Sequence, residues 1–132
     1  MLHSALQKYL DEIDTVVRSF SNVHIERYLE QILSPDRINL RIRLRFANGC
    51  LLEMNEAVVV ADEKIEALGY RYHFQNAQQA LIFRYDDTPH FPKLSTFPHH
   101  KHLPETTIAT TKPSIPEVIA EALSAMQPIP KS

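Results

Sequence analysis

The sequence of 132 residues has a single cysteine, no tryptophan and no long hydrophobic run. One cysteine, Cys50, excludes an internal disulfide framework. Because no signal-peptide pattern is present either, we expect a reducing, cytoplasmic location. No apolar run approaches the roughly 20 residues of a membrane helix, so we expect no membrane span. The net charge of −2 gives no overall attraction to nucleic acid, so any phosphate binding must come from local basic clusters.

Internal repeats, low-complexity segments and metal motifs such as HExxH or paired cysteines are also absent. Histidine, in contrast, is abundant. The sequence has seven histidines, and five of them lie between His73 and His102. The segment 84–102, RYDDTPHFPKLSTFPHHKH, combines four of these with three prolines and two adjacent aspartates. Such a concentration indicates a function, and it directs attention to this segment.

Hydrophobic periodicity predicts a single α+β domain over residues 1–132. The first segment has apolar residues three and four positions apart, which is typical of an amphipathic helix. Six prolines between Pro89 and Pro116 predict a long loop rather than a strand. Ser114 and Glu117 fit the capping box of a last helix. The predicted order is an N-terminal helix (1–22), an antiparallel meander sheet of four to five strands (23–88), a His/Pro-rich loop (89–113) and a C-terminal helix (114–127).

Two stretches of the predicted sheet are less regular. Residues 23–33 fit a helix or a strand, and the turn-like SPDR that follows favours a strand leading into the next one. Residues 61–68, ADEKIEAL, are predicted to form a short helical connection that ends at Gly69.

The first predicted hairpin follows from the strand INLRIRLRF, which alternates apolar residues with Arg41, Arg43 and Arg45. A three-residue loop over 47–49, with the glycine at positive φ, keeps apolar side chains on one face. It places Arg43 opposite Glu53. The arginine row has a spacing suited to an RNA backbone, but it is equally an ordinary solvated face with a weak ion pair to Glu53.

The second predicted hairpin joins YRYHFQ to ALIFRYD through a four-residue loop, 76–79. This register places Tyr70 opposite Tyr85 and Arg71 opposite Arg84. Two like charges in that position need an anion or a carboxylate between them.

Several polar side chains are predicted to converge at one edge of the sheet beyond this hairpin. Together they offer a base, an acid and a cation, which are the groups that metal-independent RNA cleavage requires. Imidazoles near their ordinary pKa of about 6.5 serve as acid or base. The candidate catalytic residues are His73, Arg84, Asp86, His90, His99, His100, Lys101 and His102.

Two other interpretations of the same residues remain open. In the first, Asp86 and Asp87 cap the loop, and the histidines bond carbonyl groups that the prolines leave free. In the second, His100 and His102 share the face of an extended segment, and another histidine or an aspartate completes a metal site. Lys101 within the cluster disfavours a cation, so we expect neither a metal nor another cofactor.

The run from Tyr70 to His102, followed by the KPSIPEVIAEAL helix, resembles the TumE-type family of small bacterial toxins. The match extends over most of the chain, and RYD-x-x-PH with TFPHHKH is its most specific part. Asparagine is common in the family where this chain has Asp87, and a second histidine where it has Phe91. The resemblance implies a toxin paired with a DNA-binding antitoxin and a target in translation or nucleic acid. The order of a helix before a meander is similar to RelE-like ribonuclease toxins.

Together these observations predict a toxin that cleaves RNA, free or on the ribosome, without a metal. His100 or His102 is the expected general base or acid, with His73 or His90 as its partner. Arg84 and Lys101 would stabilise the phosphorane, and Asp86 would orient a neighbour. A different hypothesis is a non-catalytic module whose histidine-rich loop docks the antitoxin or holds a structural metal, and a third is an enzyme acting on nucleotides.

Overall fold

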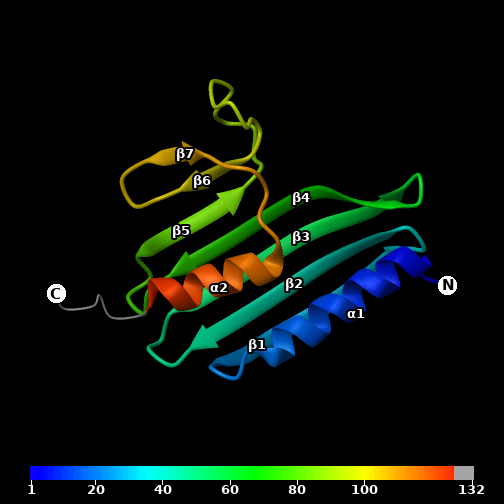
Figure 1. Cartoon of the computed structure of the whole chain (residues 1–132), viewed down its shortest axis with the longest axis horizontal. Helices are drawn as coiled ribbons and strands as arrows, with labels where there is room; N and C mark the ends of the chain where they lie inside the picture. Colours follow the sequence, from blue (N-terminus) through cyan, green and yellow to red (C-terminus); the bar gives the residue numbers. More distant parts are fainter. Residues whose placement is uncertain (127–132) are drawn as a thin grey trace.

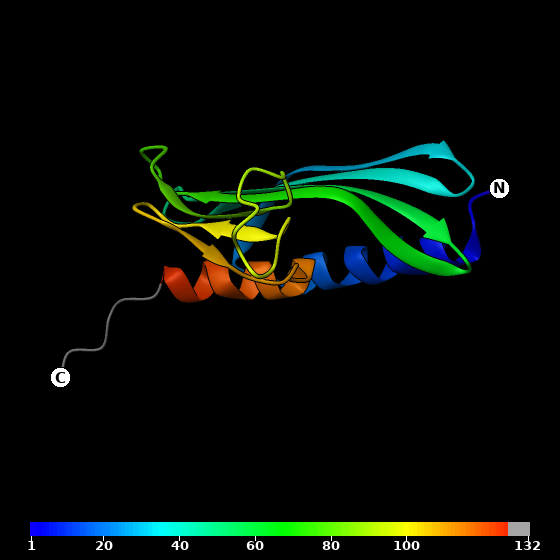
Figure 2. The same cartoon turned by 90° about the horizontal axis from the view of Figure 1, so that it is seen from above.

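The computed structural model describes residues 1–126 as two helices packed on one face of an antiparallel sheet of seven strands (Figures 1 and 2). The order of strands in the sheet follows their order in the chain, so the sheet is a meander. The α+β prediction is therefore confirmed, but four to five strands was too few. The elements are α1 (Ser4–Ser19), β1 (Val23–Ser34), β2 (Arg37–Phe46), β3 (Leu51–Ala61), β4 (Lys64–Gln75), β5 (Leu81–Asp86), β6 (His100–His102), β7 (Thr107–Ala109) and α2 (Ile115–Ala125).

Both helices bury an apolar stripe against the sheet, as their periodicity predicts. Four residues of α1 lie in the core, at spacings of three and four: Leu6, Leu10, Ile13 and Val17. Helix α2 begins with the predicted capping box, in which Ser114 Oγ accepts the Glu117 amide and the Glu117 carboxylate accepts the Ser114 amide. The last position of the predicted helix, 127, lies outside the described residues. Within residues 1–126, neither helix is long and apolar enough to cross a membrane.

The strand predicted at 23–33 and the register predicted for the first hairpin are both confirmed. Residues 23–33 are indeed extended and belong to β1, which pairs with β2 along its length. Between β2 and β3, Leu44 lies opposite Leu52 and Arg43 opposite Glu53, so the three-residue loop is confirmed. Gly49 closes that loop at φ +87, a conformation that residues with a Cβ rarely adopt.

Replacing Gly49 with alanine is expected to destabilise the protein by about 1–3 kcal/mol, because positive φ is strained for alanine. An added Cβ would also lie 2.9 Å from the Ala77 Cβ, which is too close. The matched control is Gly69→Ala, since a Cβ there meets its nearest atom at 3.9 Å. Urea unfolding of both variants measures the difference, and equal midpoints would contradict this account of the loop.

The predicted short helix at 61–68 is wrong. Strand β3 continues to Ala61, and β4 starts at Lys64 after a turn at Asp62 and Glu63, both with positive φ. The three consecutive valines of β3 favour extended backbone, and Val60 pairs with Ile65 across the turn. Tertiary pairing therefore overrides the weak helical propensity of this segment.

The predicted register of the second hairpin is also wrong, by two residues. Tyr72, not Tyr70, lies opposite Tyr85. A bulge after Phe74 and a longer loop, closed by the hydrogen bond from the Asn76 amide to the Ala80 carbonyl, cause the shift. Arg71 now lies opposite Asp86. The predicted pair of like charges, Arg71 with Arg84, is thus replaced by a pair of opposite charges, Arg71 with Asp86, and this pairing favours the observed register.

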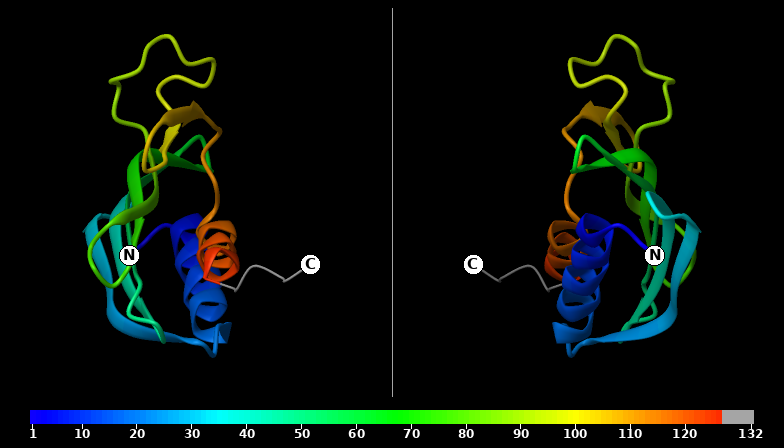
Figure 3. Two further views of the ribbon diagram at one scale, coloured as in Figure 1. Left: turned by 90° about the vertical axis from the view of Figure 1, so that its left-hand side faces the viewer. Right: turned by 90° about the vertical axis from the view of Figure 1, so that its right-hand side faces the viewer.

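The predicted loop 89–113 is only partly a loop. It contains β6 and β7, which extend the sheet from β5. Both strands have only three residues and contain no proline, so Pro98 and Pro104 interrupt no ladder. The segment between β5 and β6 extends beyond the sheet on the side of the molecule away from α1 (Figure 3). Its return brings the HHKH sequence alongside β5.

Candidate functional site

The helices cover one face of the sheet (Figure 2), and the opposite face carries two rows of mainly polar residues that run across the strands. The alternate residues of the same strands form the core, so the period of two in each strand creates these polar rows. Each row joins directly paired positions of β2 to β6. The first row is Arg41, Asn55, Arg71, Asp86 and His100. The second row is Arg43, Glu53, His73, Arg84 and His102.

Both rows end in a compact group of three side chains, the Asp86–His100–His102 cluster. The Asp86 carboxylate lies 2.7 Å from His100 Nε2 and 3.4 Å from His102 Nε2. The two Nε2 atoms are 3.1 Å apart. Asp86 is buried, and the Thr88 amide donates to its Oδ1 at 3.1 Å. A buried carboxylate thus faces two imidazoles at once.

The two histidines of the cluster differ in exposure. His100 is only 1% exposed, and its Nδ1 donates to the Pro98 carbonyl at 2.9 Å. The His102 side chain is 24% exposed, and its Nδ1 lies 3.2 Å from Thr107 Oγ1. The Phe91 ring packs edge-on against both imidazoles. Only His102 is accessible to a large substrate, so His100 is suited to a positioning role.

Arg84 lies next to the cluster and is held by His73. Arg84 Nε donates to His73 Nδ1 at 3.1 Å, and His73 Nε2 lies 2.9 Å from Gln75 Oε1. These contacts fix a neutral His73 that accepts at Nδ1 and donates at Nε2. Burial, with the charges of Arg84 and Arg71, lowers the His73 pKa below its ordinary value. His73 therefore orients Arg84 and is poorly suited to donate a proton.

The surroundings of His102, burial above all, favour its neutral form. Burial is the largest cause that lowers the His102 pKa, and the charges of His100 and Arg84 act in the same direction against Asp86. Burial and the charge of Arg71 lower the Arg84 pKa as well, but a guanidinium remains charged. A neutral imidazole and two arginines consequently occupy neighbouring positions of the two rows.

The structure does not bring His99 and Lys101 to this face. In an extended segment alternate side chains point to opposite sides, so these two residues point toward the helices. Tyr70 Oη lies 2.8 Å from His99 Nδ1, and Lys101 Nζ lies 2.5 Å from Glu121 Oε2 of α2. They contact the core side of the sheet, away from Arg84.

His90 is exposed in the segment after β5, directly before Phe91. The next residue, Phe91, covers the cluster, so the backbone of His90 lies next to the site in the chain. Asp87 has a local structural role, since its Oδ1 accepts the Tyr70 amide at 3.2 Å. The capping interpretation of the two aspartates therefore describes contacts that are present.

The arginine row of β2 is partly paired. Arg43 contacts Glu26 at 3.0 Å and Glu53 at 3.3 Å, and Arg45 contacts Glu26 at 3.2 Å. Arg41 has no ion pair among residues 1–126. Beside it, a hollow of about 230 Å³ opens where Ala57 and Gly69 have little or no side chain. Its basic lining residues are Arg41 and Arg71.

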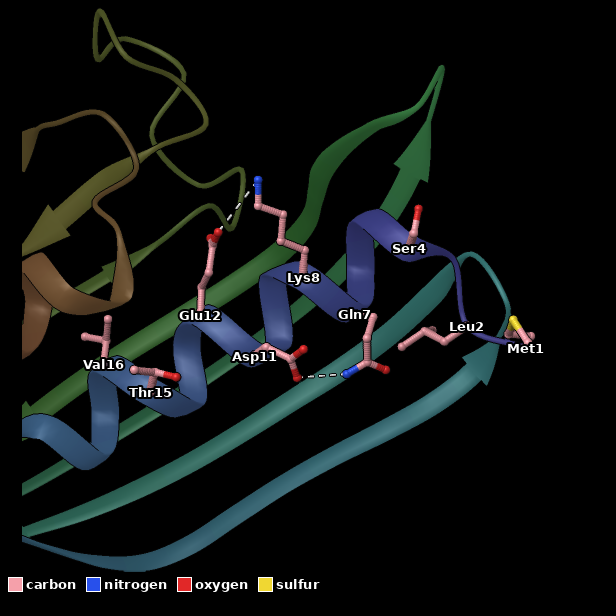
Figure 4. Close-up of a pocket in the computed structure, with 9 residues that line it drawn as sticks. All are labelled: Met1, Leu2, Ser4, Gln7, Lys8, Asp11, Glu12, Thr15 and Val16. Carbon is pink, nitrogen blue, oxygen red and sulfur yellow. Dashed lines mark hydrogen bonds and ion pairs between the residues drawn. The ribbon is translucent and has the colours of Figure 1, made fainter.

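A larger hollow, about 860 Å³, lies along the outer side of α1 (Figure 4). Its polar side chains pair within the helix: Gln7 with Asp11 at 2.9 Å and Lys8 with Glu12 at 4.0 Å. None of them converge on a common point, as Figure 4 shows. This hollow therefore lacks the arrangement that chemistry requires.

Sequence reasoning missed three residues that complete the site. Phe91 covers the imidazoles, Thr107 contacts His102, and Arg71 lies opposite Asp86. Only Arg71 had a signal, since it shares a strand face with His73. Phe91 and Thr107 come from segments without periodicity, so their positions depend on the tertiary fold.

Comparison with known families gives a match to the family model described as Toxin TumE over residues 13–128. The matched range contains all seven strands, helix α2 and every residue of the cluster. No curated protein and no solved structure gives a significant match.

Proposed function

Since this chain belongs to the TumE toxin family, we propose that it stops growth by cleaving RNA in the cytoplasm, without a metal ion, with His102 as the general base. The observation that carries the proposal is the position of the partly exposed imidazole of His102, whose pKa is lowered, beside Arg84 at the end of the polar rows. Base and cation are adjacent there, as 2′-hydroxyl attack requires. The helix-then-meander order, similar to RelE-like toxins, adds an analogy of fold only.

In the proposed step the His102 imidazole takes the proton of a ribose 2′-hydroxyl as the O2′–P bond forms. The P–O5′ bond breaks, and O5′ takes a proton from the general acid. The products are a 2′,3′-cyclic phosphate and a 5′-hydroxyl, and no water or co-reactant is consumed. His90 is the proposed acid because it is exposed next to Phe91, whereas His73 accepts a hydrogen bond from Arg84 and its lowered pKa disfavours the protonated form that an acid needs.

The remaining residues of the site have distinct roles in this proposal. Arg84, with Arg71 in the adjoining row, stabilises the charge that develops on the phosphorane. His73 is a positioning residue for Arg84. Asp86 and His100 position His102 from the buried side. Lys101 takes no part, since its ammonium is paired with Glu121.

The first polar row offers a path for the RNA backbone. Arg41 is exposed and lines the hollow with Arg71, two strands away. Arg43 and Arg45 both form ion pairs with Glu26, so they contribute less than Arg41 to the attraction of the RNA backbone. We propose that RNA crosses the helix-free face from Arg41 toward His102, and that a DNA-binding antitoxin is the partner that restrains the toxin.

Purified protein is expected to cleave total RNA equally with and without EDTA, and to leave 5′-hydroxyl ends that ligation-based end mapping detects. His102→Gln should lower the cleavage rate by about 10²–10⁴-fold, because proton transfer to a positioned base is lost. The matched control is His24→Gln, an exposed histidine of β1 far along the sheet, which should cleave normally.

Intact RNA from protein that still arrests growth would sink the ribonuclease proposal. It would favour the non-catalytic module that binds its partner through the same loop, or an enzyme acting on nucleotides. Cleavage that disappears in EDTA would instead show that a metal ion performs the chemistry.

A further inference from the structure

We propose that Asp86, His100 and His102 form a binding site for a divalent transition-metal ion of the zinc class. One oxygen of Asp86 and one ring nitrogen of each histidine lie within 4.8 Å of one another. Two imidazoles and a carboxylate are a ligand set that Zn²⁺, Fe²⁺ and Ni²⁺ accept. The site itself does not depend on the proposed ribonuclease activity.

The separations of the ligand atoms match the edges of a coordination polyhedron. Metal–ligand bonds of about 2.1 Å place neighbouring ligand atoms about 3.0 Å apart at right angles and about 3.4 Å apart at tetrahedral angles. The two Nε2 atoms are 3.1 Å apart, and the Asp86 carboxylate reaches them through different oxygens, Oδ1 at 2.7 Å from His100 and Oδ2 at 3.4 Å from His102. An ion can therefore enter with only small movements of the three side chains.

The outer contacts of both histidines already have the form that metal ligands need. His100 Nδ1 donates to the Pro98 carbonyl, so its Nε2 presents a lone pair toward Asp86 when the ring is neutral. His102 Nδ1 lies 3.2 Å from Thr107 Oγ1, and in the tautomer that a metal ligand needs Nδ1 donates to this hydroxyl oxygen. Such partners fix the tautomer and the ring orientation of metal-bound histidines. Phe91 excludes water from one side of the cluster.

The charges near the cluster limit its affinity. Asp86 supplies one negative charge. Two positive charges lie close to it, because Arg71 is opposite Asp86 and Arg84 is opposite His102 in the sheet, and both repel a cation. The partial exposure of His102 leaves room for a water molecule or another ligand on the ion. We therefore expect reversible binding, weaker than that of a closed structural zinc site.

Metal binding has a consequence that rests on the proposed function. A bound ion held by His102 Nε2 would fix the ring and give it a positive charge, so the imidazole could no longer accept the 2′-hydroxyl proton. Zinc would thus inhibit cleavage, and a chelator would restore it. This makes the site a means of control over the toxin rather than part of its chemistry.

The test is titration of tag-free protein with Co²⁺ and Zn²⁺, without RNA, followed by calorimetry and by the visible absorption of bound Co²⁺. We expect one ion per chain, and a loss of affinity of at least about 100-fold in Asp86→Asn and in His102→Gln. His99→Gln is the matched control, because it belongs to the same HHKH segment but contacts Tyr70. His102→Gln keeps the test valid if Asp86→Asn does not fold, since His102 is partly exposed.

The absence of saturable binding to the folded wild-type protein would overturn the metal site and leave the ribonuclease proposal untouched. Equal loss of affinity in His99→Gln would also overturn it, since the ligands would then lie elsewhere. Binding without any effect on RNA cleavage would retain the site and remove its inhibitory role.

Discussion

Arg84→Gln is expected to abolish growth arrest when the toxin is expressed without its antitoxin. The guanidinium is the cation nearest to the proposed base in the second row, and the loss of one such stabilising group costs about 10²–10³ in rate. The substitution keeps a polar side chain but shortens it, and it removes both the charge and the guanidinium that His73 holds. Because Arg84 lies on the helix-free face, the free energy of unfolding should change by no more than about 1–2 kcal/mol.

Growth curves, together with thermal unfolding of the purified variant, measure this result. The matched control is Arg37→Gln. Arg37 is an exposed arginine at the first position of β2, and it has no ion pair among residues 1–126. It should arrest growth like the wild type. Full arrest by Arg84→Gln at equal expression would remove Arg84 from the mechanism, whereas an unfolded Arg84→Gln would show a structural role instead.

Loss of growth arrest on substitution of His100 would be harder to interpret, although the sequence predicts His100 as a possible general base or acid. His100 is 1% exposed and contacts a buried carboxylate, so His100→Ala leaves Asp86 without its closest partner. Breaking such a pair typically costs about 3–5 kcal/mol. Loss of toxicity in that variant would report on folding as much as on chemistry, and for this reason His102→Gln is the more informative substitution.

The part of the fold that the sequence predicts is the part that local patterns encode. Strict alternation in β2, the loop at Gly49 and the Ser114 capping box each specify their structure within a few residues. The register of β4 against β5 is not specified by residues close together in the sequence. It depends on a bulge at Phe74 and on the pairing of Arg71 with Asp86, which no local pattern shows.

In the candidate site, too, the local pattern could be read from the sequence, but the pairing of distant strands could not. Alternation within HHKH separates His100 and His102 from His99 and Lys101 once the segment is known to be a strand. The number of prolines nearby favoured a loop, so the separation followed only in the alternative in which this segment is extended. The pairing of β6 with β5 then places His102 opposite Arg84, a contact between residues 18 positions apart that only the tertiary fold determines.

The core side of the sheet contains a second polar group, centred on Glu56, that should control stability rather than activity. Alternation along β3 places Glu56 on the face of Leu52 and Met54, and its side chain is 1% exposed. The hydroxyl groups of Tyr9 and Tyr72 both donate to its carboxylate, the latter at 2.5 Å. Burial and the charge of Glu56 raise the pKa of both phenols, so both remain donors at neutral pH.

Glu56→Ala is therefore expected to lower the free energy of unfolding by about 3–5 kcal/mol, because it leaves two buried hydroxyls without an acceptor and opens a cavity. Lys112, whose Nζ lies 3.8 Å from Glu56, would also lose its carboxylate partner. The matched control is Glu53→Ala, on the same strand but on the opposite face, where loss of the exposed pair with Arg43 costs under about 1 kcal/mol. Urea unfolding of the two variants compares them directly. A loss in Glu56→Ala no larger than in Glu53→Ala would mean that the tyrosines find other acceptors, and that this buried carboxylate does not hold α1 to the sheet.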